Sequence, residues 1–316
     1  MNILITGACG YISYWLINKL LASNLPIKKI VGYDNLMYKQ VSNIEYCHRP
    51  EFEFIKADVR EQDKLLKEVQ KADVIIPLAA YVGAPCCDAD KRSATEINYE
   101  QIKFIVDNMS KDQMLIYPNT DSAYGSVPSD ELCVEETPLK PVSHYGITKT
   151  NSEVYIRDKG IGVVVRLATV FGVSQRMRLD LLINDFTFKA VNDGYIVLFE
   201  KAFKRNFCHV QDVASAFVFL LERYKDVEGQ VYNVGNTSAN HTKFEVCELI
   251  KKFLPRFVVQ CDEFATDQDK RNYQVSNRKL EGLGWSCKHS VEDGIQELIK
   301  AYKIITPNQR RNYNNI

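Results

Sequence analysis

Two side chains in the stretch SHYGITK, Tyr145 and Lys149, have the types and the spacing of an acid–base pair. Residues four positions apart share one face of a helix, so the lysine ammonium can stand beside the tyrosine phenol. A free tyrosine titrates near pH ~10, and a neighbouring positive charge stabilises its phenolate. Such a pair can take a proton from a substrate hydroxyl. The same spacing also occurs on helix surfaces without a chemical role, so the interpretation needs a ligand site nearby.

A phosphate-binding turn is indicated at the start of the chain, in MNILITGACGYIS. A short apolar run is followed by Gly7 and Gly10, at what reads as the beginning of a helix. Gly7 allows a tight turn, and Gly10 allows the backbone to approach a pyrophosphate whose charge the helix N-terminus favours. Ser13 stands where the third glycine of such fingerprints is usual, and it is small enough for close helix packing. The pattern predicts a dinucleotide site.

The type of dinucleotide depends on Asp34, which ends a second apolar run, KIVGYD. A carboxylate at this place can accept hydrogen bonds from an adenosine ribose and would repel a ribose phosphate. No arginine follows Asp34 directly. We therefore expect NAD rather than NADP as the cofactor, although an aspartate that only caps a loop would give the same sequence.

Strand and helix patterns alternate along the first half of the chain, as in a parallel sheet. The expected strands are Ile3–Thr6, Ile30–Tyr33, Phe52–Lys56, Val74–Leu78, Met114–Pro118 and Gly162–Leu167. Helical periodicity lies between them, for example in YWLINKLLA, DKLLKEVQ and YEQIKFIVDNM. After about Gly172 longer helices and irregular connections follow, with one more sheet-like run at Val231–Val234. The sequence predicts an α/β fold, a Rossmann-type doubly wound parallel sheet with a smaller mixed α/β substrate-binding domain.

The expected division of the chain assigns residues 1–172 and about 206–236 to an NAD-binding domain. The smaller domain is expected to take residues from about 173 to 205 and from 237 to 316. The polar tail, residues 306–316, is expected to fray or to lie on the surface.

Composition excludes several classes of protein. The formal net charge of the 316 residues is zero, so nucleic acid is not an expected partner. The longest apolar stretch, Val213–Leu221, is about half as long as a membrane-spanning helix, and no membrane partner is expected. The nine cysteines form no CxxC pair and no His/Cys spacing suited to zinc. We expect a cytoplasmic protein with reduced thiols and no metal site.

From Met1 to about Leu298 these motifs resemble the extended short-chain dehydrogenases/reductases, the family of nucleotide-sugar epimerases and dehydratases. Thr120 in YPNTDSAYG, Tyr145 and Lys149 resemble the Ser/Thr-Tyr-Lys triad of that family. The threonine follows an expected strand, where it can hydrogen-bond a substrate hydroxyl. The resemblance implies cofactor contacts from Gly7, Gly10, Tyr11, Ile12, Asp34, Asn35, Asp58, Val59, Leu78, Ala79, Ala80, Asn98, Tyr145 and Lys149.

The second half resembles the part of the family that binds the sugar nucleotide. In RNFCHVQDVA and DKRNY, the resemblance assigns Arg205 and Arg271 to a diphosphate, which the planar guanidinium can bind with paired hydrogen bonds. His209 and Asp212 are expected to be structural. The expected substrate-binding residues are Thr120, Ser122, Arg178, Asn184, Arg205 and Arg271.

The type of reaction depends on the two residues after Thr120. The 4,6-dehydratases of the family carry Thr-Asp-Glu before Tyr-Gly, whereas this chain has Asp121 and Ser122 after Thr120. A serine cannot take the C5 proton as that glutamate does, which disfavours dehydration. The other reactions begin when Tyr145 removes the proton of the sugar 4-hydroxyl while hydride passes from C4 to NAD. An epimerase then returns the hydride to the other face, and a dehydrogenase releases the ketone.

Four segments resemble one group in particular, the GDP-D-glycero-α-D-manno-heptose 4-dehydrogenases of bacterial capsule biosynthesis: NYEQIK, IIPLAAYVGAP, YPNTDSAYG and ATVFGVSQRMRLDLLINDFT. Asp121 and Ala123 depart from the asparagine and glycine expected in that group. The resemblance implies C4 oxidation of a GDP-sugar, with a 2-oxo acid to reoxidise tightly held NADH. A UDP-glucose 4-epimerase-like activity is the main alternative, and a sensor or scaffold that binds NAD without turnover is another.

The resemblance also implies a homodimer. Family members build an intersubunit four-helix bundle from helices that correspond to those beginning near Asn98 and Tyr145. An apolar stripe on the first of these helices suits such a bundle. It is formed by Tyr99, Ile102, Ile105 and Val106.

Overall fold

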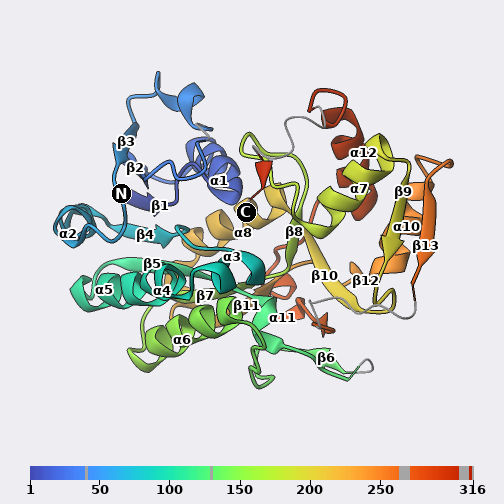
Figure 1. Ribbon diagram of the computed structural model, residues 1–316. Helices are drawn as coiled ribbons and strands as arrows, with labels where there is room; N and C mark the ends of the chain where they lie inside the picture. Colours follow the sequence, from blue (N-terminus) through green and yellow to red (C-terminus); the bar gives the residue numbers. More distant parts are fainter. Residues whose placement is uncertain (40–41, 129–130, 263–270, 306–312, 315–316) are drawn as a thin grey trace.

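The computed structural model describes residues 1–39, 42–128, 131–262, 271–305 and 313–314. Its centre is a seven-stranded sheet with the order β11-β7-β5-β4-β1-β2-β3 (Figure 1), and all neighbouring strands are parallel. The strands are β1 (Asn2–Thr6), β2 (Lys29–Asp34), β3 (Phe52–Lys56), β4 (Val74–Pro77), β5 (Met114–Thr120), β7 (Val163–Leu167) and β11 (Val231–Val234). The predicted Rossmann-type sheet is confirmed, and all the expected strands are present.

Helices cover both faces of this sheet. On one face lie α1 (Tyr11–Leu21) and α8 (Val210–Glu222), and on the other lie α2 (Gln62–Lys71), α5 (Gln101–Asn108) and α6 (His144–Asp158). Ile3 and Ile5 of β1 belong to the first core and Leu4 to the second, because successive strand residues point to opposite faces. Burial on both faces explains why these strands read as continuous apolar runs.

The smaller group of elements, on the right of Figure 1, has a core of its own. A three-stranded sheet joins β8 (Thr169–Phe171), β10 (Lys204–His209) and β12 (Asn240–Thr242), and β9 (Tyr195–Leu198) pairs with β13 (Val258–Cys261). The sequence analysis missed these strands. In β10 the polar side chains of Arg205 and Asn206 are buried, so no apolar run marks the strand.

The remaining elements are short or lie at the edges of these two groups. They are α3 (Ala84–Ala89), α4 (Lys91–Thr95), α7 (Leu182–Asn192), α9 (Tyr224–Val227), α10 (Lys243–Lys251), α11 (Arg278–Glu281), α12 (Val291–Ala301), β6 (Leu132–Cys133), β14 (Gln274–Val275), the 3-10 turns η1 (Ile44–Tyr46) and η3 (Asp121–Tyr124), and the π-helical turn η2 (Glu96–Glu100). The helix expected from Tyr99 therefore begins with the π-helical turn and continues as α5.

The apolar stripe assigned to a dimer interface packs instead inside the chain. Ile102, Ile105 and Val106 are 1%, 0% and 6% exposed and belong to the core between α5 and the sheet. Helical periodicity shows that a face is covered but not what covers it, and the prediction is wrong for these residues. Exposed apolar side chains lie instead on α6, where Ile147 and Val154 are 42% and 48% exposed. The homodimer itself stays a prediction.

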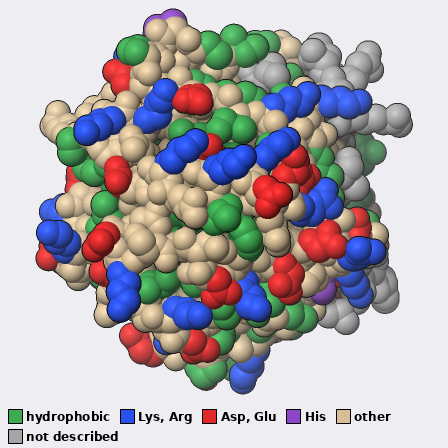
Figure 2. Space-filling model, turned by 90° about the vertical axis from the view of Figure 1, so that its left-hand side faces the viewer, with side chains coloured by type: hydrophobic (Ala, Val, Ile, Leu, Met, Phe, Trp, Pro, Cys, Tyr) green, Lys and Arg blue, Asp and Glu red, His purple; other side chains and the backbone are tan. Residues whose placement is uncertain are grey.

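Basic and acidic side chains are interspersed on the face shown in Figure 2, without a field of one sign. Across the residues that the structure describes, no helix is long and apolar enough to cross a membrane. Of the polar tail, only 313 and 314 are described, and the Tyr313 carbonyl accepts a hydrogen bond from the Leu179 N–H at 3.0 Å. The rest of that prediction lies outside the described residues.

Candidate active site

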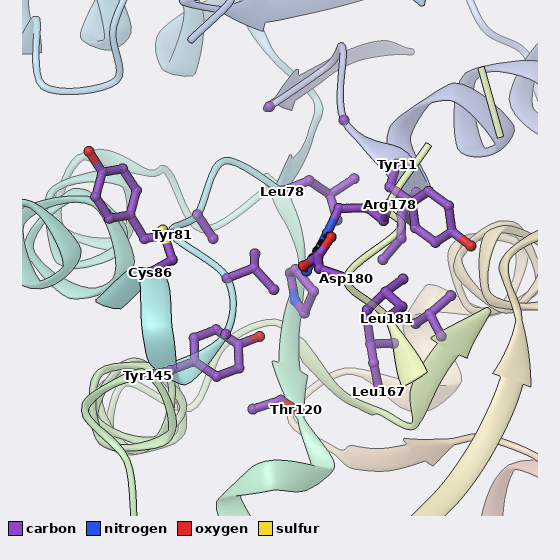
Figure 3. Close-up of a pocket in the computed structure, with 18 of the residues that line it drawn as sticks. Tyr11, Leu78, Tyr81, Cys86, Thr120, Tyr145, Leu167, Arg178, Asp180 and Leu181 are labelled. Carbon is purple, nitrogen blue, oxygen red and sulfur yellow. Dashed lines mark hydrogen bonds and ion pairs between the residues drawn. The ribbon is translucent and has the colours of Figure 1, made fainter. Parts of the chain in front are cut away.

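A cavity of about 750 Å³ opens after the carboxyl ends of β1, β2, β4, β5 and β7 and is closed on its other side by residues of the smaller group. This is the edge where open parallel sheets bind ligands. The close-up in Figure 3 shows side chains from both parts of the chain converging on it. The predicted site residues that line the cavity are Gly7, Gly10, Tyr11, Ile12, Asp34, Asn35, Val59, Leu78, Ala79, Ala80, Thr120, Ser122, Tyr145, Lys149, Arg178, Arg205 and Arg271.

Three predicted site residues lie behind the wall of the cavity rather than in it. Asn98 holds the loop after β4, since its amide bonds the N–H and the carbonyl of Tyr81, each at 2.9 Å. Asn184 is fully buried, with Oδ1 accepting from the Gly172 N–H at 3.1 Å and Nδ2 donating to the Arg178 carbonyl at 2.8 Å. Both amides thus hold the wall of the cavity, and their expected contacts with cofactor and substrate stay predictions.

Asp58 is the third of these residues, and its carboxylate is hydrogen-bonded by two neighbouring side chains. It accepts two hydrogen bonds from the Arg60 guanidinium and one from the Asn35 amide, all at 2.9 Å. The hydrogen bonds from Arg60 lower the pKa of Asp58 to about 2. The side chain therefore stays charged and fixes Asn35, which does line the cavity.

The turn between β1 and α1 has the shape of a phosphate cradle. Gly7 has φ +67°, and a Cβ at this residue would lie 2.6 Å from the Ala79 nitrogen, so only glycine fits. Helix α1 begins after Gly10 with no side-chain cap, which leaves its first N–H groups for a ligand. Ser13, at the place of the third glycine, donates its hydroxyl to the Gly7 carbonyl at 2.6 Å. The serine thus stabilises the turn.

Asp34 stands at the end of β2 beside this turn. Its carboxylate accepts from the N–H of Cys9 at 3.0 Å and from the N–H of Leu36 at 2.7 Å, and each oxygen retains a lone pair for a ribose hydroxyl. Burial raises its pKa, while these hydrogen bonds and the charge of Arg176 act in the other direction. Arg176 also lines the cavity, with its guanidinium 4.5 Å from the centre of the Tyr38 ring. The sequence analysis missed Arg176, because it reaches Asp34 only through the fold.

Replacing Asp34 with alanine is expected to weaken NAD binding at least ~10-fold, because hydrogen bonds to a charged group contribute about 1.5–3 kcal/mol. The ratio of the affinity for NAD to the affinity for NADP should fall as well, since the negative charge of Asp34 disappears while the positive charge of Arg176 remains. Calorimetric titration of both cofactors measures the two effects, with the exposed Asp112→Ala as a matched control. A wild-type protein that binds NADP as tightly as NAD would contradict the assignment.

Thr120, Tyr145 and Lys149 come together at the floor of the cavity. Thr120 ends β5, and α6 begins at His144, where the Ser143 hydroxyl caps the Gly146 N–H at 3.2 Å. Figure 3 shows the Tyr145 phenol and the Thr120 side chain directed into the same space. Lys149 is only 4% exposed, and its Nζ lies 4.2 Å from the centre of the Tyr117 ring. The residue types predicted for acid–base chemistry therefore share one site.

Burial dominates the protonation of this pair. It raises the pKa of Tyr145 to about 12, against the opposing effects of Arg178, of Thr120 as a hydrogen-bond partner and of Arg271. Burial also lowers the pKa of Lys149 to about 7. The protein alone thus keeps the phenol protonated at neutral pH. A bound ligand that adds positive charge would make Tyr145 a base.

The two arginines expected to bind a diphosphate lie together at one end of the cavity. Arg205 is 2% exposed and donates to the carbonyls of Lys204, at 2.8 Å, and of Arg271. Arg271 in turn donates to the Ser122 hydroxyl, which also accepts from Thr120 at 3.1 Å. A chain of hydrogen bonds therefore links the arginines to Thr120.

An ion pair that the sequence analysis did not predict lies at another part of the wall. Arg178 donates from Nε to both carboxylate oxygens of Asp180, at 2.8 and 3.1 Å, and from Nη2 to one of them. Both side chains line the cavity near Leu181 (Figure 3). The segment RMRLD has no helical or strand periodicity, so its sequence did not show that the two residues would pair.

Below the site, the protein buries a polar network, of which only Asn119 lines the cavity among the residues named here. Arg166 of β7 and Glu153 of α6 form an ion pair with N–O distances of 2.6 and 3.1 Å, and both are at most 1% exposed. Asn119, the residue before Thr120, donates to Glu153. Asp121 is also buried there, and neither of its oxygens has a hydrogen-bond partner among the described residues. Burial raises the pKa of Asp121 well above its usual range, which favours its protonated form.

His209 and Asp212 lie outside the cavity and have structural contacts, as expected. His209 caps α8 by accepting from the Gln211 N–H at 3.4 Å and pairs with Glu297 at 2.7 Å. The Asp212 carboxylate accepts from the His289 N–H and bonds the His289 ring, both at 2.9 Å. The two histidines connect α8 to the segment before α12 and to α12 itself.

Comparison with known proteins agrees with this geometry. The pattern of the NAD dependent epimerase/dehydratase family matches residues 3–235. The chain is 28% identical, over 95% of its length, to the trifunctional UDP-glucose 4,6-dehydratase/UDP-4-keto-6-deoxy-D-glucose 3,5-epimerase/UDP-4-keto-L-rhamnose-reductase RHM1 of Arabidopsis thaliana, and spans about half (47%) of that protein. It is 27% identical to a putative UDP-glucose 4-epimerase of Methanocaldococcus jannaschii, covering 95% of this chain and 98% of that protein.

A solved structure shares the fold over nearly the whole chain. The dTDP-glucose 4,6-dehydratase of Bacillus anthracis, in complex with NAD, superposes with a TM-score of 0.81 at 25% identity, covering 96% of this chain and 97% of the other. These proteins carry different reactions on one fold, so the choice among reactions depends on the residues of the cavity.

Proposed function

This chain belongs to the NAD dependent epimerase/dehydratase family, and we propose that it oxidises C4 of a nucleotide-activated sugar. The observation that carries the proposal is the convergence on one cavity of three parts: the glycine turn with Asp34, the Thr120, Tyr145 and Lys149 group, and the arginine pair. The glycine turn and the uncapped start of α1 fit the NAD expected of the family. When bound, NAD supplies the hydride acceptor and a positive charge.

The residues of the chain then divide the work. The turn at Gly7 and the carboxylate of Asp34 hold the cofactor, and Arg205 and Arg271 bind the diphosphate of the sugar nucleotide. Thr120 hydrogen-bonds the sugar 4-hydroxyl, and Tyr145 removes its proton as C4 is oxidised. Lys149 supports the phenolate and can donate to the nicotinamide ribose.

The wall of the cavity disfavours dehydration, although the relatives include dehydratases. Ser122 stands where the family's dehydratases carry a glutamate base, and its hydroxyl is bonded to Thr120 and Arg271. Asp121, which those enzymes use as an acid, is buried away from the cavity. Among the described residues that line the cavity there is no glutamate. Oxidation or epimerisation at C4 therefore fits these residues better.

Within these reactions we favour a dehydrogenase that acts on GDP-D-glycero-α-D-manno-heptose in the synthesis of a surface polysaccharide. Support comes from the resemblance of the segments around Val82, Thr120 and Arg178, all of which form the wall of the cavity. A 2-oxo acid would then reoxidise the NADH. The alternative is a 4-epimerase that returns the hydride to the sugar.

A single-turnover reaction with GDP-heptose is expected to give the 4-ketone and about one NADH per site, and continued turnover is expected only when a 2-oxo acid is added. Absorbance at the NADH band and mass spectrometry of the sugar nucleotide measure both products, with UDP-glucose as the comparison substrate. A C4 epimer formed without net NADH would identify an epimerase. NAD that is not reduced by any nucleotide sugar would favour a sensor or scaffold.

A further inference from the structure

We propose that the Arg178–Asp180 ion pair tunes the base of this site, with Arg178 supplying a permanent positive charge to the Tyr145 phenolate and Asp180 moderating it. Both are positioning residues, because they act through Tyr145. The proposal rests on the proposed function in one respect: it takes Tyr145 as the base.

The geometry places the pair and the phenol on one ligand space. Arg178, Asp180 and Tyr145 all line the cavity, and Figure 3 shows the pair and the phenol oxygen directed into it from opposite walls. The segment that carries the pair is fixed, because Asn184 donates to the Arg178 carbonyl and itself bonds Tyr11 at 3.2 Å. The backbone that carries Arg178 is therefore held in place in the cavity wall.

The pair is also a costly feature to keep in a cavity wall. The Arg178 and Asp180 side chains are 8% and 17% exposed, and burying two charges rarely gives net stability over apolar residues of the same size. Despite burial, which acts to raise it, the pKa of Asp180 lies below its usual range because of Arg178. Within the described part of the chain, the Nη1 group of Arg178 has no hydrogen-bond partner. The pair therefore keeps a cationic donor available at the cavity.

Three other charged or titratable groups lie near Tyr145, but two of them carry no constant charge and the third, Arg271, is bonded to another side chain. Lys149, on the same helix, has its pKa lowered to about 7 by burial, so it is partly neutral at physiological pH. Cys87 of α3 stays a neutral thiol, since burial raises its pKa to about 12. Arg271 is bonded to Ser122 at the end of the cavity where the diphosphate is expected. Arg178, as a guanidinium, stays charged throughout this range.

The contributions of neighbouring groups to the pKa of Tyr145 agree with this assignment. Burial raises the pKa of Tyr145 most, and Arg178 makes the largest opposing contribution among its neighbours. Removing Arg178 should therefore raise the pKa of Tyr145, because a cation that stabilises the phenolate is lost. Removing the charge of Asp180 should lower it, because Arg178 is then uncompensated. The two substitutions should move the base in opposite directions.

The test compares Arg178→Gln and Asp180→Asn with the wild type in the NAD-loaded protein. We expect the ascending limb of the pH profile for NAD reduction to move up by about one pH unit in the first variant and down in the second. Arg178→Lys, which keeps the charge, should move it less than Arg178→Gln. The exposed Asp193→Asn serves as the matched control for a lost carboxylate, and thermal unfolding checks each fold.

Tyrosinate absorbance gives a readout that needs no sugar. Titration of the NAD complex, taken as the difference from Tyr145→Phe, follows Tyr145 alone among the 17 tyrosines. If the protein oxidises no sugar but the opposite shifts are seen, the proposed function fails and the tuning stands. If oxidation depends on Tyr145 but the ascending limb moves in neither variant, or moves in the same direction in both, the tuning is overturned. A raised KM with an unmoved limb in Arg178→Gln would make Arg178 a substrate contact instead.

Discussion

Tyr145→Phe is expected to lower the turnover of C4 oxidation by at least ~10²-fold while the affinity for the nucleotide sugar stays nearly unchanged. We propose that the phenol oxygen takes the 4-hydroxyl proton, so its contribution is expected mainly in the transition state. Arg205 and Arg271, which we propose bind the diphosphate, are not changed by the substitution. Single-turnover NAD reduction measures the rate, and calorimetry on the NAD-loaded protein measures affinity.

Helix α6 offers a matched control for this substitution. Tyr155 lies on the same helix but donates its hydroxyl to Asp107 at the surface, away from the cavity. Tyr155→Phe should therefore keep full activity. Lys149→Met should reduce both the rate and the retention of NAD, because the lysine serves the phenolate and the ribose together. Oxidation that continues unchanged in Tyr145→Phe would show that another group is the base.

The sequence predicted those parts of the site whose chemistry is local. A glycine turn, an aspartate at a strand end and a tyrosine–lysine pair on one helix each depend on neighbours within a few residues, so spacing alone indicates them. The central strands could be predicted equally well, because burial on both faces makes them continuous apolar runs. Gly7, Asp34 and Tyr145, each predicted from such a local pattern, line the same cavity in the structure.

Features that depend on residues distant in the sequence could not be predicted in this way. Asp180 and Arg176 come from an irregular segment, and their relation to Tyr145 and Asp34 exists only in the folded chain. Strand β10 carries buried polar residues, so it lacks an apolar pattern. The stripe on α5 was correctly seen as covered, but the sequence could not show that the sheet covers it. A single sequence shows which face of a helix or strand is covered and how its residues are spaced. Which distant residues contact that face follows only from the fold.

A second large effect is expected beneath the site, where Arg166→Met should destabilise the protein by about 3–5 kcal/mol. Arg166 and Glu153 are almost fully buried, and the same guanidinium donates to the Tyr124 hydroxyl at 2.9 Å and the Glu135 carbonyl at 2.8 Å. Removing it leaves the Glu153 carboxylate buried without its cation. The midpoint of urea unfolding, compared at one cofactor concentration, measures the loss.

The effect should come from the unpaired charge rather than from the lost arginine as such. Arg157 also approaches Glu153, at 3.6 Å, but its side chain is 54% exposed, so Arg157→Met should change stability by less than about 1 kcal/mol. The double variant Arg166→Met/Glu153→Met should be more stable than Arg166→Met alone, since no isolated charge remains. Because Glu153 joins α6 to Asn119, the residue before Thr120, the single variant should also loosen the alignment of Thr120 with Tyr145. Equal stability of Arg166→Met and the wild type would show that the buried pair does not hold these two elements together.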